Sequence, residues 1–281
     1  MSSVIGRHAR LELAFGSRGE RTVLAHAYAE PPFRIGRTFD LDGALYLILV
    51  CEGPGIFGGD QLHLAVTVES GARVLLVSQA ALQVHPSTGD EPARVVHQYL
   101  VQDGGELHCQ WDPMIPFAGA RVVQQFDLQI AGAGRLYWSD ALMSGRCSRG
   151  EAWMFRQLAH ELRLTVGGSL MYLERYQLGD GNRHHPKVPD SRPVLDLAGG
   201  ANYLGTGLVR HPEATGDVAE RIQRAIDRLE GVRAGVDRVE PSLIAGRFLA
   251  DAGPPFSRAR ALFRDAALAE LFKTPGLVVR R

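Results

Sequence analysis

Three glycines in the first quarter of the chain have the spacing of a dinucleotide-binding loop. Gly53, Gly55 and Gly58 form the pattern G-x-G-x-x-G directly after the apolar run 45–50. Such a loop holds a pyrophosphate only where it opens a helix, because the N-terminal amides and the helix dipole bind the anion. Residues 61–69 instead alternate apolar and polar side chains, which is the two-residue period of a strand. The glycines are therefore predicted to join two strands, and no nucleotide site is expected there.

Common catalytic motifs are missing from the sequence. It contains no G-x-S-x-G, no Walker A lysine loop, no H-E-x-x-H and no C-x-x-C. Ser139, Asp140 and the ten histidines supply the residue types of a hydrolytic triad, but a triad is defined by its geometry and any chain of this size contains those types. Surface and turn roles for these polar residues are the simpler interpretation.

Histidines and carboxylates offer candidate metal ligands. His108 and Cys109 are neighbours on a predicted strand, so their side chains face opposite ways and cannot bind one ion without a bulge. His184 and His185 lie in a proline-rich stretch and could bind nickel, copper or zinc, for which imidazole is suited, although such a loop pair is more often simply solvated. Carboxylates at or near predicted strand ends or glycine turns, where a single one is usually a turn-former or an arginine partner, are Asp60, Asp140, Glu151 and Glu174.

Composition excludes several classes of protein. Lysine plus arginine equals aspartate plus glutamate at 31 each, so the net charge indicates no nucleic-acid partner and no anionic membrane surface. No apolar run approaches the roughly 18 to 20 residues of a membrane span, and the N-terminus lacks the apolar block of a signal peptide. Three widely spaced cysteines argue against a disulfide framework and fit a reducing compartment. We expect a soluble, cytoplasmic, globular protein.

Short apolar or alternating runs separated by glycine-rich turns fill the first 180 residues. Their spacing of about 8 to 12 residues is typical of stacked antiparallel sheets and not of βαβ units. The predicted strands cover 11–15, 22–28, 44–50, 62–69, 72–77, 95–101, 106–111, 120–130 and 135–143. We therefore expect a mainly β fold, in which antiparallel or mixed sheets form a layered, sandwich-like body over residues 1–180.

The rest of the chain has a different pattern. Residues 181–200 begin with a proline-rich, weakly apolar stretch and are predicted to be a loop or linker. Residues 201–281 are expected to form a small C-terminal α/β part, with about two helices and a strand over 243–249, packed on the β body as one continuous unit.

Helix signals are clearest in that C-terminal part. A stripe at helical spacing predicts the first helix, with Thr215 or Asp217 as its cap, and consists of Val218, Ile222, Ile226 and Leu229. The second helix is expected to begin at Ser257 and to stop before Pro275 and Gly276. Earlier in the chain, the four-residue spacing of Met154, Leu158 and Leu162 predicts a helix over 151–163, although the flanking runs look like a hairpin.

Several segments resemble, in the same order along the chain, motifs of the urease accessory protein UreD family, also called UreH. The run 53–62 is similar to the family's P-P-G-G-[IV]-x-G-G-D-x-L, and residues 140–151 resemble its D-x4-G-R-x3-G-E. Shorter matches are 70–72 to a turn into the next strand, 116–120 to F-x-G-A, 173–175 to L-E-R and 246–249 to V-R-F-L. Their common order is specific, and together they span residues 10–178 and 230–272.

The resemblance implies a non-catalytic scaffold with no permanently bound cofactor. It implies a UreF-like helical partner, a UreG-like GTPase reached through UreF, and docking on apo-urease to deliver nickel to its dinuclear site. An internal passage has been proposed for the ion in this family, and its positions correspond here to Asp60 and Asp140, with Glu151 nearby. His108 replaces an acidic residue of the family and joins these three as a predicted transient nickel ligand. The resemblance also implies a strand, not a helix, over 151–163, and we adopt the strand because the flanking motifs align on both sides.

The chain departs from the family pattern at several places, so the scaffold role is carried over more directly than the ion path. The R-P-F-Y-P-E stretch has no clear counterpart between residues 35 and 42, and the terminal P-R-I-W is absent. The L-E-W-L-P-Q-[ED] strand appears as 107–113, with Asp112 as a shifted acidic residue. Two alternatives stay open: a UreD-fold paralogue that serves another metal or partner, and an unassigned hydrolase. The hydrolase would need a deep pocket in which a histidine reaches a serine or cysteine nucleophile.

Overall fold

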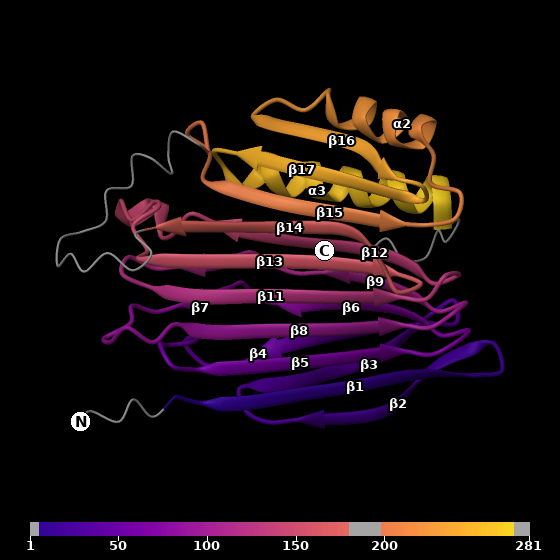
Figure 1. The fold of residues 1–281 in the computed structure, drawn as a ribbon, viewed down its shortest axis with the longest axis horizontal. Helices are drawn as coiled ribbons and strands as arrows, with labels where there is room; N and C mark the ends of the chain where they lie inside the picture. Colours follow the sequence, from indigo (N-terminus) through magenta and orange to yellow (C-terminus); the bar gives the residue numbers. More distant parts are fainter. Residues whose placement is uncertain (1–5, 180–197, 273–281) are drawn as a thin grey trace.

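The computed structural model describes residues 6–179 and 198–272. In these residues two β-sheets pack face to face, and two α-helices cover the outer face of one of them (Figure 1). Figure 1 shows the strands of the front sheet stacked from β1 and β2 at the bottom to β14, with the C-terminal elements at the top. The expected mainly β, layered architecture with C-terminal helices is confirmed.

Seven strands form one sheet, in the spatial order β14-β13-β11-β8-β5-β1-β2. Their bounds are β1 His8–Arg18, β2 Arg21–Ala29, β5 Gln61–Val68, β8 Ala93–Val101, β11 Arg121–Ile130, β13 Gln157–Val166 and β14 Ser169–Gly179. Within the described residues this seven-stranded sheet has β2 and β14 at its edges.

The second sheet has ten strands and includes the C-terminal part of the chain. Eight of them follow the order β16-β17-β15-β12-β9-β6-β4-β3, and the short β7 and β10 pair beside β12. The bounds are β3 Phe33–Leu41, β4 Ala44–Cys51, β6 Arg73–Gln79, β7 Leu82–Val84, β9 Glu106–Gln110, β10 Met114–Pro116, β12 Arg135–Met143, β15 Tyr203–Arg210, β16 Val232–Glu240 and β17 Leu243–Ala250.

Strand direction is the main feature that the glycine turns did not predict. The central strands of each sheet are parallel: β1, β5, β8, β11 and β13 in one, and β4, β6, β9 and β12 in the other. Antiparallel pairs flank them, as in β1–β2, β13–β14 and β12–β15. Parallel neighbours need a crossover connection, and here the crossover is a strand in the opposite sheet, since the chain runs β5, β6, β8, β9, β11, β12, β13. The sheets are therefore mixed. Mixed sheets were one of the two expected arrangements, the other being purely antiparallel sheets.

The segment 151–163 corrects one sequence-based prediction. Strand β13 begins at Gln157, and residues 151–156 form turns, so the helix predicted from Met154, Leu158 and Leu162 is wrong and the strand implied by the family resemblance is right from Gln157 on. A spacing of four residues is also an even number, so it puts side chains on one face of a strand as well. Leu158, Leu162 and Leu164 are indeed all buried.

The C-terminal part extends the ten-stranded sheet and covers its outer face. Strand β15 pairs with β12, and β17 pairs with β15. Helices α2 (Gly216–Ile226) and α3 (Gly253–Ala267), with the π-helical turn η2 (Leu268–Phe272), pack against that face and bury a second apolar cluster. The short 3-10 turn η1 (Cys147–Arg149) precedes β13. The predicted linker 181–200 and the stop at Pro275 and Gly276 lie mostly or wholly outside the described residues.

Local capping explains where the two helices begin. The Thr215 side chain accepts a hydrogen bond from the backbone N–H of Val218 at 3.4 Å, so Thr215 is the cap of α2 and Asp217 lies in its first turn. Helix α3 begins at Gly253, four residues before the predicted Ser257, because proline is accommodated in the first helical turn, where its missing N–H needs no partner.

The glycine run closes one end of the sandwich. It connects β4 to β5, and a strand follows it, so the helix that a pyrophosphate loop requires is not there. Gly55 has φ +122°, and a Cβ built on it would stand 2.3 Å from the backbone oxygen of Gln83. This close approach lets Ile56 pair with Val84 in an isolated bridge. The glycine at position 55 therefore allows the turn after β4 to pack directly against the backbone of β7.

We expect Gly55→Ala to destabilise the protein by about 3 kcal/mol or more, since it combines an unfavourable φ with a clash against backbone. Gly53→Ala is the matched control, because Gly53 has φ +97° but open space around the added Cβ. It should cost only about 1–2 kcal/mol from backbone strain. Urea unfolding followed by tryptophan fluorescence measures both, and equal losses would contradict this account of the loop.

Candidate functional site

The four predicted nickel ligands do not meet at one point. Among the described residues, no group of three or more histidine, cysteine, aspartate or glutamate side chains is placed to hold one metal ion. His108 and Asp140 lie on opposite faces of the ten-stranded sheet, since His108 pairs in register with Tyr137 and Asp140 is three residues further along β12. Any role in ion movement must therefore be spread along the molecule.

Asp60 is engaged in closing its own turn. Its carboxylate oxygens accept the backbone N–H groups of Arg7, at 2.8 Å, and of Phe57, at 3.0 Å. The residue is 5% exposed. This is the turn-forming role that an aspartate after two glycines has by default, and it ties the N-terminal segment to the glycine run.

Glu151 is engaged with an arginine. The Arg146 guanidinium donates to both oxygens, at 2.8 and 2.6 Å, and the backbone N–H of Ala118 donates to one of them at 3.3 Å. The hydrogen bonds from Arg146 hold the pKa of Glu151 below its usual value. Arg146 also lies over the ring of Phe117, 4.1 Å from its centroid, so this pair fixes the turns before β11 and β13.

His108 lies on the outer face of the ten-stranded sheet, beneath the C-terminal helical turn. Its Nε2 donates to the carboxylate of Glu106 at 2.7 Å, and its ring contacts Phe272 edge-on at 4.6 Å. Burial favours the neutral form of Glu106, but the bond from His108 and the charges of Arg135 and Arg73 outweigh it and lower the pKa of that carboxyl. The Nδ1 atom is buried with no hydrogen-bond partner among the described residues. Cys109 faces the opposite way, into the core between the sheets, as predicted.

Asp140 is a carboxylate inside the sandwich. It follows Leu136 and Trp138 on the inward face of β12 and is 7% exposed. Burial, with a smaller contribution from the nearby Glu174, raises the pKa of Asp140 to about 7. The nearest basic atom is Nε2 of His160, 3.9 Å from its Oδ2.

Glu174 and Arg247 form an ion pair close to Asp140. Arg247 donates to Glu174 Oε1 at 2.5 Å and to the hydroxyl of Tyr172 at 2.7 Å, and Thr206 donates to Glu174 Oε2 at 3.1 Å. The Arg247 side chain is 52% exposed and that of Glu174 only 5%. The pair therefore connects the interior near Asp140 to solvent.

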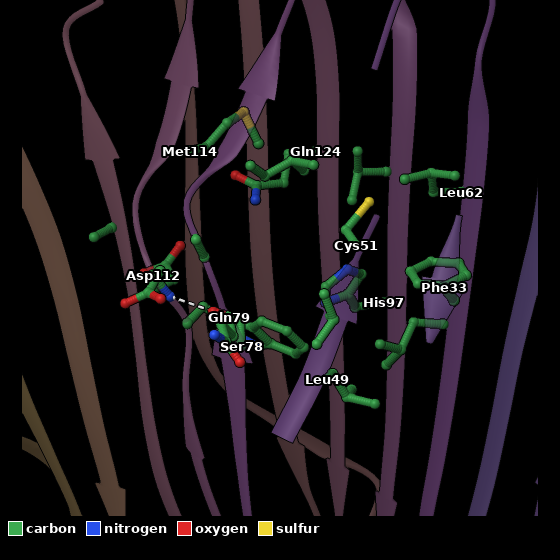
Figure 2. Close-up of a pocket in the computed structure, with 18 of the residues that line it drawn as sticks. Phe33, Leu49, Cys51, Leu62, Ser78, Gln79, His97, Asp112, Met114 and Gln124 are labelled. Carbon is green, nitrogen blue, oxygen red and sulfur yellow. Dashed lines mark hydrogen bonds between the residues drawn. The ribbon is translucent and has the colours of Figure 1, made fainter. Parts of the chain in front are cut away.

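Three cavities adjoin these residues. The outer cavity, of about 430 Å³, lies on the helix-covered face and includes His108, Gln110 and Asp112 in its lining. The inter-sheet cavity, of about 70 Å³, is mostly apolar and lies between the sheets (Figure 2). The edge cavity, of about 210 Å³, lies beside β14, β15 and β17, and its polar lining includes Glu174 and Arg247.

Neighbouring cavities share lining residues. The outer and inter-sheet cavities share Ser78, Gln79, Ala80 and Asp112, at or just beyond the ends of β6 and β9. Figure 2 shows the hydrogen bond of 2.7 Å between the backbone N–H of Asp112 and Ser78 Oγ at this junction. The inter-sheet and edge cavities share Gln124, Asp140 and Ala141. The three cavities are therefore adjacent to one another, with shared walls, from the helix-covered face of the ten-stranded sheet to its inner face.

Two interior histidines were missed from the sequence. His97 lies on β8 and His160 on β13, and both strands alternate buried and more exposed residues. Each histidine occupies a buried position at which the alternation predicts an apolar residue. This signal was present for His97 in the run 95–101. For His160 the incorrect helix over 151–163 concealed it. Glu174 was noted as a candidate carboxylate but was not included among the predicted ligands.

The comparisons with known proteins agree with the motif resemblance. The family model described as UreD urease accessory protein matches residues 7–280 of the chain. The chain belongs to the UreD family. A urease accessory protein UreD from Deinococcus radiodurans is 29% identical over 278 residues, 98% of this chain and 95% of that protein. The UreD of Sorangium cellulosum is 35% identical over 203 residues, which cover 72% of this chain and 64% of that protein. The UreD of Cupriavidus pinatubonensis is 30% identical over 229 residues, which cover 81% of this chain and 76% of that protein.

Membership of the UreD family makes the protein a urease accessory protein and not an enzyme. Within residues 6–179 and 198–272 no serine or cysteine side chain is hydrogen-bonded to a histidine, so the hydrolase alternative gains no support there. None of the helices in the described part of this UreD protein has both the length and the apolar character needed to span a bilayer.

The interior histidine His97 gives a pH-dependent test of the inter-sheet cavity. Burial lowers its pKa to about 3, and its Nδ1 is 3.1 Å from the hydroxyl of Tyr99. An exposed imidazole in the unfolded chain has a pKa near 6.5, so below that pH the unfolded state binds a proton that the folded state does not, and stability falls as the pH falls. We expect His97→Gln to reduce the slope of the free energy of unfolding against pH by up to about 1.4 kcal/mol per pH unit.

Urea unfolding between about pH 7 and about pH 5 measures the slope. Tyr99→Phe is the control, because it removes the hydroxyl but keeps the imidazole and should leave the slope near that of the unsubstituted protein. An unchanged slope in His97→Gln would mean that His97 is not a buried neutral group.

Proposed function

We propose that the protein is a cytoplasmic, non-catalytic scaffold for urease maturation. It binds a UreF-like helical accessory protein and, through it, a UreG-like GTPase, and the assembly docks on apo-urease and assists delivery of nickel to the dinuclear site. Nickel is the cargo in transit, and no permanently bound cofactor is part of the proposal. Family membership supports the urease-related role.

The observation that carries the ion-transfer part is the series of three adjacent cavities that share lining residues. An ion entering the outer cavity beside His108 would pass Asp112 at the first junction and Asp140 at the second, and would leave the edge cavity near Glu174. A dication inside a protein loses the hydration that stabilises its charge, so it needs oxygen or imidazole ligands at intervals. Ligands that are few at each point bind weakly enough to release the ion again.

Asp60 and Glu151 contribute to this proposal in a different way. Both carboxylates are hydrogen-bonded to neighbouring groups at one end of the sandwich. They hold the turns before β5, β11 and β13, and so the ends of strands that line the cavities. Their predicted role as transient nickel ligands requires that these hydrogen bonds open.

The ion path is tested by nickel-dependent activation of apo-urease with the accessory partners present. Asp140→Asn keeps the shape of the side chain and removes its charge, so we expect roughly a tenfold slower activation with unchanged binding of the partners. Asp127→Asn is the matched control: Asp127 lies on β11, its carboxylate accepts from Gln129, and it lines none of the three cavities. Normal activation by Asp140→Asn would rule out this path and leave the scaffold role intact.

The scaffold role is tested separately by co-expression and co-purification. We expect the unsubstituted chain and Asp140→Asn to capture the UreF-like partner, the GTPase and apo-urease equally. Failure of the unsubstituted chain to capture any of them would contradict the scaffold proposal. Capture combined with failure to activate urease with nickel would favour the paralogue that serves another metal.

A further inference from the structure

Two hydrogen-bond acceptors face each other between the sheets, beside the point where Asp140 lines both the inter-sheet and the edge cavities. One is Asp140 Oδ2 on β12, and the other is Nε2 of His160 on β13, in the opposite sheet, at 3.9 Å. His160 is 3% exposed, and its Nε2 has no hydrogen-bond partner among the described residues. The hydrogen bond at the other ring nitrogen, Nδ1, explains why Nε2 carries no hydrogen.

Gln124 fixes the tautomer of His160. These residues are register partners in the parallel pair β11–β13, and Nδ1 of the imidazole is 3.1 Å from Gln124 Oε1. An amide oxygen cannot donate, so Nδ1 carries the hydrogen and donates it. A neutral ring with its hydrogen on Nδ1 has a lone pair on Nε2.

The ring is also held in orientation. It stacks on Tyr176, its register partner on β14, with 4.6 Å between centroids and 10° between planes. Phe126 flanks it at 5.8 Å. A histidine that is held by stacking, donates one N–H to an oxygen and presents its other nitrogen to a carboxylate has the arrangement of a metal ligand with its supporting partner.

We propose that Asp140 and His160 together form a binding site for a borderline divalent cation such as Ni²⁺, with Gln124 as the residue that positions His160. Metal–nitrogen and metal–oxygen bonds are each about 2.0–2.2 Å, so one ion can bridge two atoms that are 3.9 Å apart without large movement of either sheet. The imidazole ligand selects nickel, cobalt, copper or zinc over magnesium and calcium, which prefer oxygen ligands alone.

The site has only two protein ligands in the described part of the chain, so the remaining positions would be filled by water from the edge cavity, of about 210 Å³. The positive charge of Arg247 nearby is compensated by its pairing with Glu174. An open, partly hydrated coordination sphere suits an ion that is released again. In this respect the inference rests on the proposed function, but binding itself can be measured without urease.

Equilibrium dialysis of the full chain against Ni²⁺ tests the site. All proteins carry His184→Gln and His185→Gln, so that this histidine pair does not add a background site. We expect one site whose affinity falls roughly 10- to 100-fold in His160→Gln and in Asp140→Asn. His97→Gln is the matched control, because His97 is also a buried histidine, but its Nδ1 meets a tyrosine hydroxyl and in the described part of the chain it forms no ion pair with a carboxylate. Equal affinity in His160→Gln and His97→Gln would overturn the proposal.

A measurement on the chain with His160 and Asp140 in place covers the case in which a core variant does not fold. In ¹⁵N-histidine NMR spectra, His160 should be the Nδ1–H tautomer, and added Zn²⁺ should shift its unprotonated Nε2. Gln124→Leu, if folded, should lose the tautomer preference and weaken Zn²⁺ binding roughly tenfold, which a space-filling role alone would not do. A hydrogen on Nε2, or an Nε2 signal that Zn²⁺ leaves unmoved, would overturn the proposal.

The two proposals can fail independently. Binding at Asp140 and His160 combined with normal urease activation by Asp140→Asn would keep the cation site and remove it from the nickel path. Absence of binding, with partner capture retained, would remove the site and leave the scaffold.

Discussion

The whole structure depends on the apolar interface between the two sheets. Each inward-facing strand position contributes one layer of this core, from Leu11 and Phe15 in the first strand to Leu208 and Leu243 near the end of the chain. Between β4 and β13 the chain passes repeatedly from one sheet to the other, so successive strands add to both walls and bury apolar surface as the sheets grow. The parallel direction of the central strands, the stacked glycine turns and the position of every interior side chain follow from this constraint.

Polar side chains interrupt the core at one place. His97, Gln124, Asp140 and His160 all face inward, and Gln124 and Asp140 line both the inter-sheet and the edge cavities. A buried carboxylate is costly unless it is paired, and a buried imidazole nitrogen without a partner is costly too. A protein that needed only a stable sandwich would gain by replacing them. Their presence is consistent with our proposal that the interior carries a charged cargo, and this proposal links the cluster to the role of a urease accessory protein.

Much of the fold could be predicted from local pattern. The period of two residues identified the strands, and the stripe Val218, Ile222 and Ile226 identified the first helix with its Thr215 cap. Errors arose where one pattern fits two structures. A spacing of four residues fits both a helix and a strand, so the local pattern alone predicted a helix at 151–163, and only the family resemblance indicated the strand that β13 forms from Gln157 on. Glycine-rich turns connect strands within a sheet or between sheets equally well, which hid the parallel pairing.

The candidate site was predictable only in part. Asp140 was identified through its family motif, and the opposite directions of His108 and Cys109 followed from strand geometry. The partners of Asp140 could not be found in this way, because His160 is twenty residues further along the chain and belongs to the other sheet. Asp60 and Glu151 carry the same chemical group as Asp140, yet hydrogen bonds from backbone and from Arg146 engage theirs.

The sequence by itself determined the mainly β class, most strands of the β body, the two C-terminal helices, the family and the exclusion of a nucleotide loop, because each of these depends on residue type and spacing along the chain. The tertiary structure decided which polar groups meet, which are already satisfied and where the cavities run. Those properties depend on how two sheets are brought face to face, and distances across that interface are not encoded in any local pattern.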